Sequence, residues 1–210
     1  MFQQLFFLLI VRPLVLVVLG LNVRHRERIP AKGPAIIVSN HNSHLDTLVL
    51  MTLLPWLLLP RLRPVAAKDY FLRNRLLAWF ALNIMHIIPL EREIIDRHQD
   101  PLAACSEALQ NGDILILFPE GSRGDPEQMG TFKGGIAHLA KRHSDVPITP
   151  IFLHGLGKAL PKGEALLVPF FCDVFIGEPI RWSGDRTSFM TSLEQEITSL
   201  AEEGYRPAWE

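Results

Sequence analysis

Residues 114–118 read Ile-Leu-Ile-Leu-Phe, and residues 119–124 continue with Pro-Glu-Gly-Ser-Arg-Gly. Five consecutive apolar residues bounded by turn formers are typical of a strand that is buried on both faces. Pro119 has no N–H to give to a strand ladder, so we expect the strand to end at this residue. The polar residues that follow would then lie at the carboxyl end of a central strand, where open α/β sheets bind their ligands.

On both sides of this strand, short apolar runs alternate with amphipathic stretches. This alternation predicts an α/β fold, with a layered, mostly parallel or mixed sheet flanked by helices. We expect a main domain over residues 30–210, preceded by a separate apolar segment over residues 1–29. Further strands are expected at residues 35–38, 64–67, 85–88, 148–153, 166–168 and 172–176. Helices are expected at residues 46–54, 72–82, 100–111, 135–143 and 188–204.

The composition excludes several classes of protein. The 210 residues contain 21 Lys and Arg against 22 Asp and Glu, a net charge of −1, so we expect no nucleic-acid partner. With 48% hydrophobic residues, the chain is apolar and long enough to bury a core without a structural metal. Cys105 and Cys172 match no zinc motif, so we expect two small buried residues in a reducing compartment.

The N-terminal segment 1–29 is the main source of the mean hydropathy of +0.18, which is high for a soluble protein. Phe2–Val23 holds sixteen Leu, Ile, Val or Phe residues and is interrupted in its middle by Arg12-Pro13. We expect residues 1–29 to form a membrane anchor of one or two short apolar helices, bent at Pro13. A single spanning helix and insertion into one leaflet are both compatible with this sequence. The segment ends in three cations that suit the anionic cytoplasmic surface of the inner membrane, namely Arg24, Arg26 and Arg28.

A histidine and a carboxylate stand five residues apart between an expected strand and an expected helix, in Asn40-His41-Asn42-Ser43-His44-Leu45-Asp46. On a regular helix this spacing separates them by about 140°, so they meet only if His41 lies in the loop and Asp46 in the first helical turn. With Ser43 as the N-cap, Asp46 would fix the tautomer of His41, whose second ring nitrogen would act as a general base. Ser43 and Asp46 are equally typical of a capping box without any catalytic role.

The three polar side chains His41, His44 and Asp46 also invite comparison with a metal triad. Their spacing, HxxHxD with no adjacent third histidine, does not match such a site, so we expect no metal and no cofactor. We expect His44 to lie at the start of the helix, where it would at most line a neighbouring ligand pocket.

The turn after Phe118 carries the second group of candidate site residues. Gly121 allows a tight turn and a close approach of the backbone to a ligand. Arg123 offers a planar fork that suits a phosphate, and Glu120 can accept from a hydroxyl or hold the arginine. Lys133 precedes an expected helix N-terminus, which favours an anion. The alternative is an exposed polar hairpin that binds nothing.

Taken in order, these motifs resemble the phospholipid and glycerol acyltransferase family, which includes the 1-acylglycerol-3-phosphate acyltransferases. That family is marked by NHxxxxD, a basic motif after a strand, FPEGTR or FPEGSR, and a VPIxP block. The second motif departs from the family pattern, because Glu91 stands where the family often has an aspartate. The resemblance covers residues 30–180, with motifs at Asn40–Asp46, Pro89–Arg92, Phe118–Arg123 and Val146–Pro150.

The resemblance implies that His41 deprotonates an acceptor hydroxyl, which attacks an acyl thioester without an acyl-enzyme, while Asp46 orients His41. The donor would be acyl-CoA or acyl-carrier protein, and the acceptor a lysophospholipid, first of all 1-acylglycerol-3-phosphate, giving phosphatidic acid. Both lipids reside in a bilayer, so the enzyme would be associated with membrane lipids and work on the cytoplasmic face of the inner membrane. The acceptor site would comprise Glu120, Gly121, Ser122, Arg123, Arg92 and Lys133.

Two other functions are compatible with the same residues. The same chemistry would serve another lysolipid or an amino-acid lipid as acceptor. A non-catalytic peripheral lipid-binding protein would use Asp46 only as a helix cap, and predicts equal losses of stability from Asp46→Ala and Ser43→Ala. One basic run is either a solvated face or a contact with lipid headgroups or a carrier's phosphates, namely Arg61, Arg63, Lys68, Arg73 and Arg75.

Overall fold

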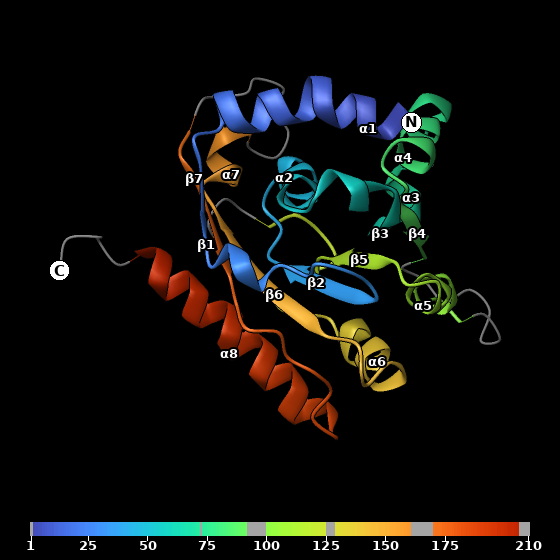
Figure 1. Ribbon diagram of the computed structural model, residues 1–210. Helices are drawn as coiled ribbons and strands as arrows, with labels where there is room; N and C mark the ends of the chain where they lie inside the picture. Colours follow the sequence, from blue (N-terminus) through green and yellow to red (C-terminus); the bar gives the residue numbers. More distant parts are fainter. Residues whose placement is uncertain (1, 72, 92–99, 125–128, 161–169, 206–210) are drawn as a thin grey trace.

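A seven-stranded mixed sheet forms the centre of the protein, in a computed structural model that describes residues 2–71, 73–91, 100–124, 129–160 and 170–205 (Figure 1). The strand order is β1-β7-β6-β2-β5-β3-β4, and every neighbouring pair is parallel except β6 with β7. The α/β fold expected from the sequence is therefore confirmed. The strands are β1 Leu21–Arg24, β2 Ala35–Ser39, β3 Leu62–Ala67, β4 Ile88–Leu90, β5 Ile114–Leu117, β6 Ile148–His154 and β7 Cys172–Ile176.

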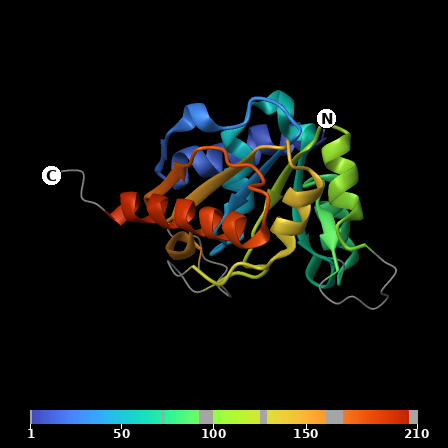
Figure 2. The ribbon, with the colours of Figure 1, turned by 90° about the horizontal axis from the view of Figure 1, so that it is seen from below.

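Helices cover both faces of this sheet. One face packs against the N-terminal helical segment and five further helices: α2 Leu45–Leu53, η4 Trp56–Arg61, α3 Lys68–Phe71, α4 Arg75–Asn83 and α7 Leu156–Ala159. The opposite face packs against three helices that Figure 2 shows from below: α5 Ala103–Gln110, α6 Gly135–Arg142 and α8 Arg186–Tyr205.

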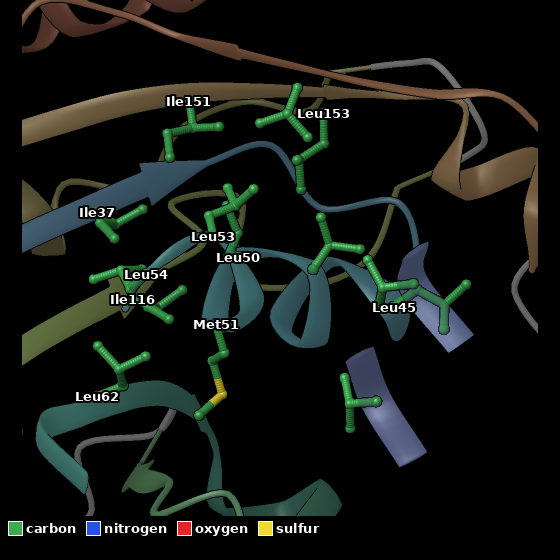
Figure 3. Packing of buried hydrophobic residues seen from close by; sticks show 14 of the residues in the cluster. Ile37, Leu45, Leu50, Met51, Leu53, Leu54, Leu62, Ile116, Ile151 and Leu153 are labelled. Atoms are coloured by element: carbon green, nitrogen blue, oxygen red, sulfur yellow. The ribbon is translucent and has the colours of Figure 1, made fainter. Parts of the chain in front are cut away.

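The central strands are buried on both sides, which explains their unbroken apolar sequences. Successive side chains of a strand point to opposite faces, so Ile37 joins the core under α2 while Ile36 joins the core over α5 and α6. Figure 3 shows the first of these cores, where Leu50, Leu53 and Leu54 of the α2 region lie toward the sheet, while Met51 points away from it into the same core cluster. Each fully buried aliphatic side chain of this kind contributes about 1.5–3 kcal/mol relative to an exposed one.

Most expected elements coincide with the structure to within one or two residues. Strand β7 has the bounds expected from the sequence, and α8 buries Phe189, Leu193 and Ile197 as its periodicity predicts. The expected strand at residues 85–88 is wrong, since β4 begins only at Ile88. Residues 84–87 remain hydrogen-bonded to the end of α4, because the Met85 N–H donates to the carbonyl of Phe80 and the Ile87 N–H to that of Ala81. The expected strand at residues 166–168 lies outside the described residues.

The helix expected over residues 72–82 begins later than the sequence predicts, at Arg75, and a separate short helix precedes it. Helix α3 ends at Phe71, and α4 starts after Asn74, whose side chain accepts a hydrogen bond from the Leu76 N–H at 2.9 Å. An asparagine at an N-cap competes well with continued helix, since its side chain replaces a missing backbone acceptor. This break leaves α3 at the carboxyl end of β3.

The N-terminal segment is one continuous helical run over residues 2–18, made of α1 Phe2–Phe6, η1 Phe7–Val11 and η2 Leu14–Val18. The bend expected at Pro13 is absent, because the flanking turns have the wider π-helical pattern, in which Arg12 N–H reaches the carbonyl of Phe7. Within the described ranges, no helix is both long and apolar enough to cross a membrane. One side of the run is buried in the core, through Phe7, Val11, Val15 and Leu19.

The cations after this helix are part of the folded domain. Strand β1 pairs in parallel with β7, so residues 21–24 belong to the sheet although they fall inside the segment expected to be a separate anchor. Arg24 lies 3.8 Å from Glu203, and Arg28 Nε lies 2.9 Å from Glu178. Two of the three cations expected to face anionic lipid are thus partly neutralised by carboxylates of the same chain.

Candidate active site

The site begins where β2 ends, and Asn40 fixes that point. Its side-chain amide donates to the carbonyl of Leu153 at 2.9 Å, and the Leu153 N–H donates to its Oδ1 at 2.8 Å. The buried amide therefore ties the end of β2 to β6 in place of a backbone pair. His41 is the second residue of the following loop, after Asn40, and lies at the carboxyl end of the central strands, where open α/β sheets place their ligand sites.

His41 and Asp46 meet as the sequence predicts. His41 Nδ1 lies 2.9 Å from Asp46 Oδ2, and the same oxygen accepts from the N–H groups of Asn42 at 2.7 Å and Ser43 at 2.8 Å. Asp46 is 1% exposed, and its other oxygen, Oδ1, is buried without a hydrogen-bond partner among the described residues. A buried carboxylate that accepts three hydrogen bonds on one oxygen keeps both the loop and the imidazole in place.

The helix start differs in detail from the expected capping box. Helix α2 begins at Leu45, so Asp46 is its second residue and His44, rather than Ser43, occupies the N-cap position. Ser43 Oγ accepts from the Leu45 N–H at 3.3 Å and donates to the carbonyl of Leu160 at 3.1 Å. The shift arises because Asp46 captures the N–H groups of the two residues before His44. Asp46 therefore caps the loop and contacts His41 at the same time.

The turn after β5 holds His41 from the other side. The imidazole ring of His41 stacks on the ring of Phe118, with centroids 4.0 Å apart and an interplanar angle of 19°. The His41 N–H donates to Glu120 Oε1 at 2.9 Å, and the Gly124 N–H donates to the His41 carbonyl at 2.9 Å. The first and third motifs of the sequence are thus one structural unit, and the imidazole has little freedom to rotate.

Glu120 braces this unit from inside the protein. Its Oε1 accepts from His41 and its Oε2 from the Gly130 N–H at 3.0 Å, while the residue is 6% exposed. Burial raises the pKa of this carboxyl above its usual value, against the effect of the two N–H donors. The structure places Glu120 behind His41, so its expected contact with an acceptor hydroxyl or with Arg123 stays a prediction.

The other residues of the turn after β5 lie nearer the protein surface than Glu120. Gly121 has φ +71°, which disfavours any side chain, and a Cβ there would lie 2.8 Å from Lys133 Nζ. The backbone N–H of Lys133 donates to the carbonyl of Pro119 at 2.8 Å, which places the Lys133 side chain against Gly121. Ser122 is exposed beside Gly121. Arg92, the remaining cation expected in the acceptor site, lies outside the described residues.

Tyr70 is a site residue that the sequence reasoning missed. Its hydroxyl lies 3.0 Å from His44 Nε2, and the guanidinium carbon of Arg123 lies 5.9 Å from its ring centre. Partial burial, followed by the charges of Arg123 and His41, lowers the pKa of His44 to about 4. A tyrosine just after a strand on the same sheet edge was the available signal, because carboxyl ends of parallel strands converge.

The family model described as Acyltransferase matches residues 20–154, which include this whole arrangement from His41 to Lys133. The chain belongs to the acyltransferase family. Its fold matches that of the 1-acyl-sn-glycerophosphate acyltransferase PlsC from Thermotoga maritima, with a TM-score of 0.77. That match is 22% identical in sequence and covers 98% of this chain and 80% of the other.

Curated relatives carry a common name, 1-acyl-sn-glycerol-3-phosphate acyltransferase. The chloroplastic protein LPAT1 of Arabidopsis thaliana is 32% identical over 78% of this chain and 44% of its own length. The alpha protein of Homo sapiens is 31% identical over 77% of this chain and 55% of its length. The Pseudomonas aeruginosa protein is 30% identical over 86% of this chain and 67% of its length. The chain therefore spans about half the length of the first two relatives.

The structure divides the basic run of residues 61–75 according to where each residue lies along the sheet. Arg63 Nε lies 3.0 Å from Asp113 and Arg61 3.9 Å from it, at the opposite end of the strands from His41. Lys68 pairs with Glu91, the residue that replaces the family's usual aspartate. Arg73 is the member of the run whose guanidinium lies beside this site, 4.9 Å from the Tyr70 ring centre, whereas Arg75 is exposed at the start of α4.

Neither a cluster of metal ligands nor a reactive cysteine is found in the described part of the chain. There, no three His, Cys, Asp or Glu side chains group together as ligands of an ion. Cys105 and Cys172 are buried, as expected, and burial raises the pKa of the Cys105 thiol to about 11. A buried thiol with such a pKa is a packing residue rather than a nucleophile.

Proposed function

We propose that this protein transfers a fatty acyl group from acyl-CoA or acyl-carrier protein to the hydroxyl of a lysophospholipid. The acceptor we propose is 1-acylglycerol-3-phosphate, and the product phosphatidic acid. The observation that carries the proposal is the contact of His41 Nδ1 with the buried Asp46 Oδ2 at 2.9 Å, beside the turn that bears Arg123. The shared name of the curated relatives supports the same acceptor.

His41 has the geometry of a general base. Asp46 occupies Nδ1, so the acceptor hydroxyl would give its proton to Nε2, while the hydroxyl oxygen attacks the thioester carbonyl carbon. The C–S bond then breaks, the ester C–O bond remains, and the leaving thiolate takes up the proton. Asp46 stabilises the transient imidazolium, because an ionised carboxylate at hydrogen-bond distance favours the charged form of the ring. No acyl-enzyme is needed.

The acceptor phosphate would bind at the turn after β5. Arg123 supplies a planar guanidinium for it, and Gly121 lets the backbone come close. Ser122 and Lys133 line the same turn, and Arg92 completes the set of expected ligands. An anion at this position leaves the hydroxyl of the glycerol backbone free to reach His41.

The decisive experiment compares wild type with His41→Ala, using 1-acylglycerol-3-phosphate and acyl-CoA or acyl-carrier protein. We expect the variant to lose at least about a hundredfold in kcat, the usual contribution of a general base. Activity that survives within tenfold would contradict the mechanism. Wild type that prefers another lysolipid or an amino-acid lipid would keep the chemistry and change the acceptor.

We also propose that the protein works at a membrane surface, on its cytoplasmic face. Apolar side chains remain exposed on the N-terminal helix, on η4 and on α4, including Leu9 (62%), Val17 (81%) and Leu76 (80%). A mainly apolar groove of about 390 Å³ lies between the helix and η4, and Arg12 is among the residues that line it. Exposed apolar surface of this extent on one side of a protein is typical of a membrane contact. The N-terminal helix would lie in one leaflet rather than cross it.

A further inference from the structure

Tyr70 is the centre of a small cationic cluster on the edge of the proposed acceptor site. The guanidinium carbon of Arg73 lies 4.9 Å from the Tyr70 ring centre, and that of Arg123 lies 5.9 Å from the same centre. The Tyr70 hydroxyl is 3.0 Å from His44 Nε2. Two arginines that stand far apart in the sequence therefore converge on one aromatic ring, next to the loop that holds His41.

Helix α3 keeps Tyr70 in this position. Lys68, at its start, pairs with Glu91 just after β4, which ties α3 to the sheet edge. Phe71 packs edge-on against Tyr70, with ring centroids 5.0 Å apart, and also against the buried core. The tyrosine ring is thus fixed from both ends of this short helix. A fixed ring holds a guanidinium in a defined place at little entropic cost.

The charges around Tyr70 favour an anion. The segment 68–75 holds Lys68, Arg73 and Arg75 against one acid, Asp69, and Lys68 is already paired with Glu91, so Arg73 and Arg75 carry the excess positive charge. His44 remains neutral at physiological pH, because partial burial and the charges of Arg123 and His41 lower its pKa to about 4. The guanidinium groups of Arg73 and Arg123, both beside the Tyr70 ring, give this part of the surface a positive potential. A phosphate monoester, with its two negative charges, would relieve it.

We propose that Arg73, positioned by the Tyr70 ring, is a second guanidinium for the phosphate of the acceptor, acting together with Arg123. This inference rests on the proposed function and makes it more specific, since it predicts selectivity for acceptors with a terminal phosphate. Arg73 is the binding group, whereas Tyr70 is a positioning residue. Tyr70 and Arg73 are the residues of the sequence that would indicate this second guanidinium, and both lie outside the four family motifs.

The test measures KM and kcat separately for Arg73→Ala. The acceptors are a short-chain, monomeric acylglycerol phosphate and a monoacylglycerol with the same chain. We expect KM for the phosphate acceptor to rise about tenfold or more, the effect of one charge-assisted bidentate contact, with kcat within about threefold. The Arg73→Lys variant should recover part of the affinity, because it restores the charge but not the fork.

Two further variants separate positioning from folding. Tyr70→Phe keeps the ring under Arg73 and loses only the hydroxyl contact with His44, so its KM should stay near that of wild type. Tyr70→Leu removes the ring and should raise KM for the phosphate acceptor as Arg73→Ala does. Equal effects of the two variants on both acceptors would indicate a folding defect and overturn the positioning role.

Arg75→Ala is the matched control, since Arg75 is an exposed arginine of the same segment at the start of α4. If Arg73→Ala and Arg75→Ala raise KM equally, the cations act only by general attraction and the proposal is wrong. Loss of phosphate selectivity in Arg73→Ala alone supports it. Wild type that acylates neither acceptor would instead contradict the proposed function, which keeps the two failures distinct.

Discussion

Asp46 shows how one side chain can serve both the fold and the chemistry of the site. Its Oδ2 accepts from two backbone N–H groups and faces His41, while Oδ1 is buried and has no partner in the described part of the chain. A cap alone needs only the backbone contacts, and a catalytic orienter needs only the imidazole contact. Because one oxygen of Asp46 makes both kinds of contact, the effect of substituting Asp46 must be compared with that of substituting a neighbour with only a structural role, such as Ser43.

The substitution Asp46→Asn should separate these roles. The amide oxygen can still accept from Asn42 and Ser43, but a neutral group no longer stabilises the imidazolium of His41. We expect kcat to fall at least about a hundredfold with KM nearly unchanged, whereas stability falls by only about 1–2 kcal/mol. Ser43→Ala is the control, because it loses the contact with Leu45 and should cost about 1 kcal/mol with activity retained. Steady-state kinetics and urea unfolding provide both measurements.

His44 should make stability depend on pH. Its pKa is about 4 in the folded protein against 6.5 for the ordinary group, so the unfolded chain binds the extra proton first as pH falls. Stability should therefore decrease between pH 6.5 and pH 4, on the order of 1 kcal/mol because solvent screens the partly exposed ring. His44→Gln should lose this dependence in urea unfolding at pH 7 and pH 4.5. If the free energy of unfolding changes equally with pH in wild type and in His44→Gln, the prediction is wrong.

At the scale of residues, local spacing predicted more than long-range contact. The meeting of His41 and Asp46 depends only on a strand, a short loop and a helix start, all readable within the segment 40–46. The bracing by Glu120 requires knowing that β5 lies beside β2, and that its carboxylate turns inward to His41 and Gly130. Tyr70 was missed for the same reason, since its position depends on the pairing of β3 with β5.

At the scale of elements, the strength of the apolar pattern determined what could be predicted. Strands β2, β5 and β7 are buried on both faces, so their apolar runs have clear ends. Strand β1 was missed, because Leu21–Arg24 alternates apolar and polar residues over only four positions and follows a longer apolar run. An edge strand buries one face and depends on its partner, and β7 lies near the other end of the chain.

Helix α4 exposes an apolar side that the core does not explain. Leu76 is 80% and Trp79 57% exposed, although α4 lies beside the N-terminal helix in Figure 1. We expect Leu76→Glu combined with Trp79→Glu to weaken binding to anionic phospholipid vesicles about tenfold or more, since two large side chains leave the lipid. Vesicle co-sedimentation measures this. Thr191→Glu with Thr198→Glu on α8 adds the same charge on the opposite face, and should leave binding unchanged.

At the scale of the whole molecule, the N-terminal helix joins two environments. One side supplies Phe7, Val11, Val15 and Leu19 to the core, and the other exposes Leu9 and Val17. The amphipathic division was not readable from the sequence, because nearly every residue of the run is apolar and both sides have the same composition. Only the packing of the run across the sheet (Figure 1) distinguishes the buried side from the exposed one.

This dual contact predicts different results for two ways of disabling the segment. Deletion of residues 2–19 removes four buried side chains worth about 1.5–3 kcal/mol each, which approaches the whole stability of an ordinary domain. We expect the truncated chain not to fold, as judged by thermal unfolding in mild detergent. Leu9→Glu with Val17→Glu should instead leave the unfolding midpoint near that of wild type, because both positions are exposed, and should lower vesicle binding.

A truncated chain that unfolds cooperatively at the wild-type midpoint would contradict this assignment and show a detachable anchor. The paired variants make the distinction clear, since both reduce membrane contact but only the deletion opens the core. If the double glutamate variant stays folded, loses vesicle binding and still acylates a short-chain soluble acceptor, then the helix holds the domain to the lipid surface without taking part in the chemistry at His41. Loss of soluble-acceptor activity in that folded variant would instead place the exposed side of the helix in the path of the substrate.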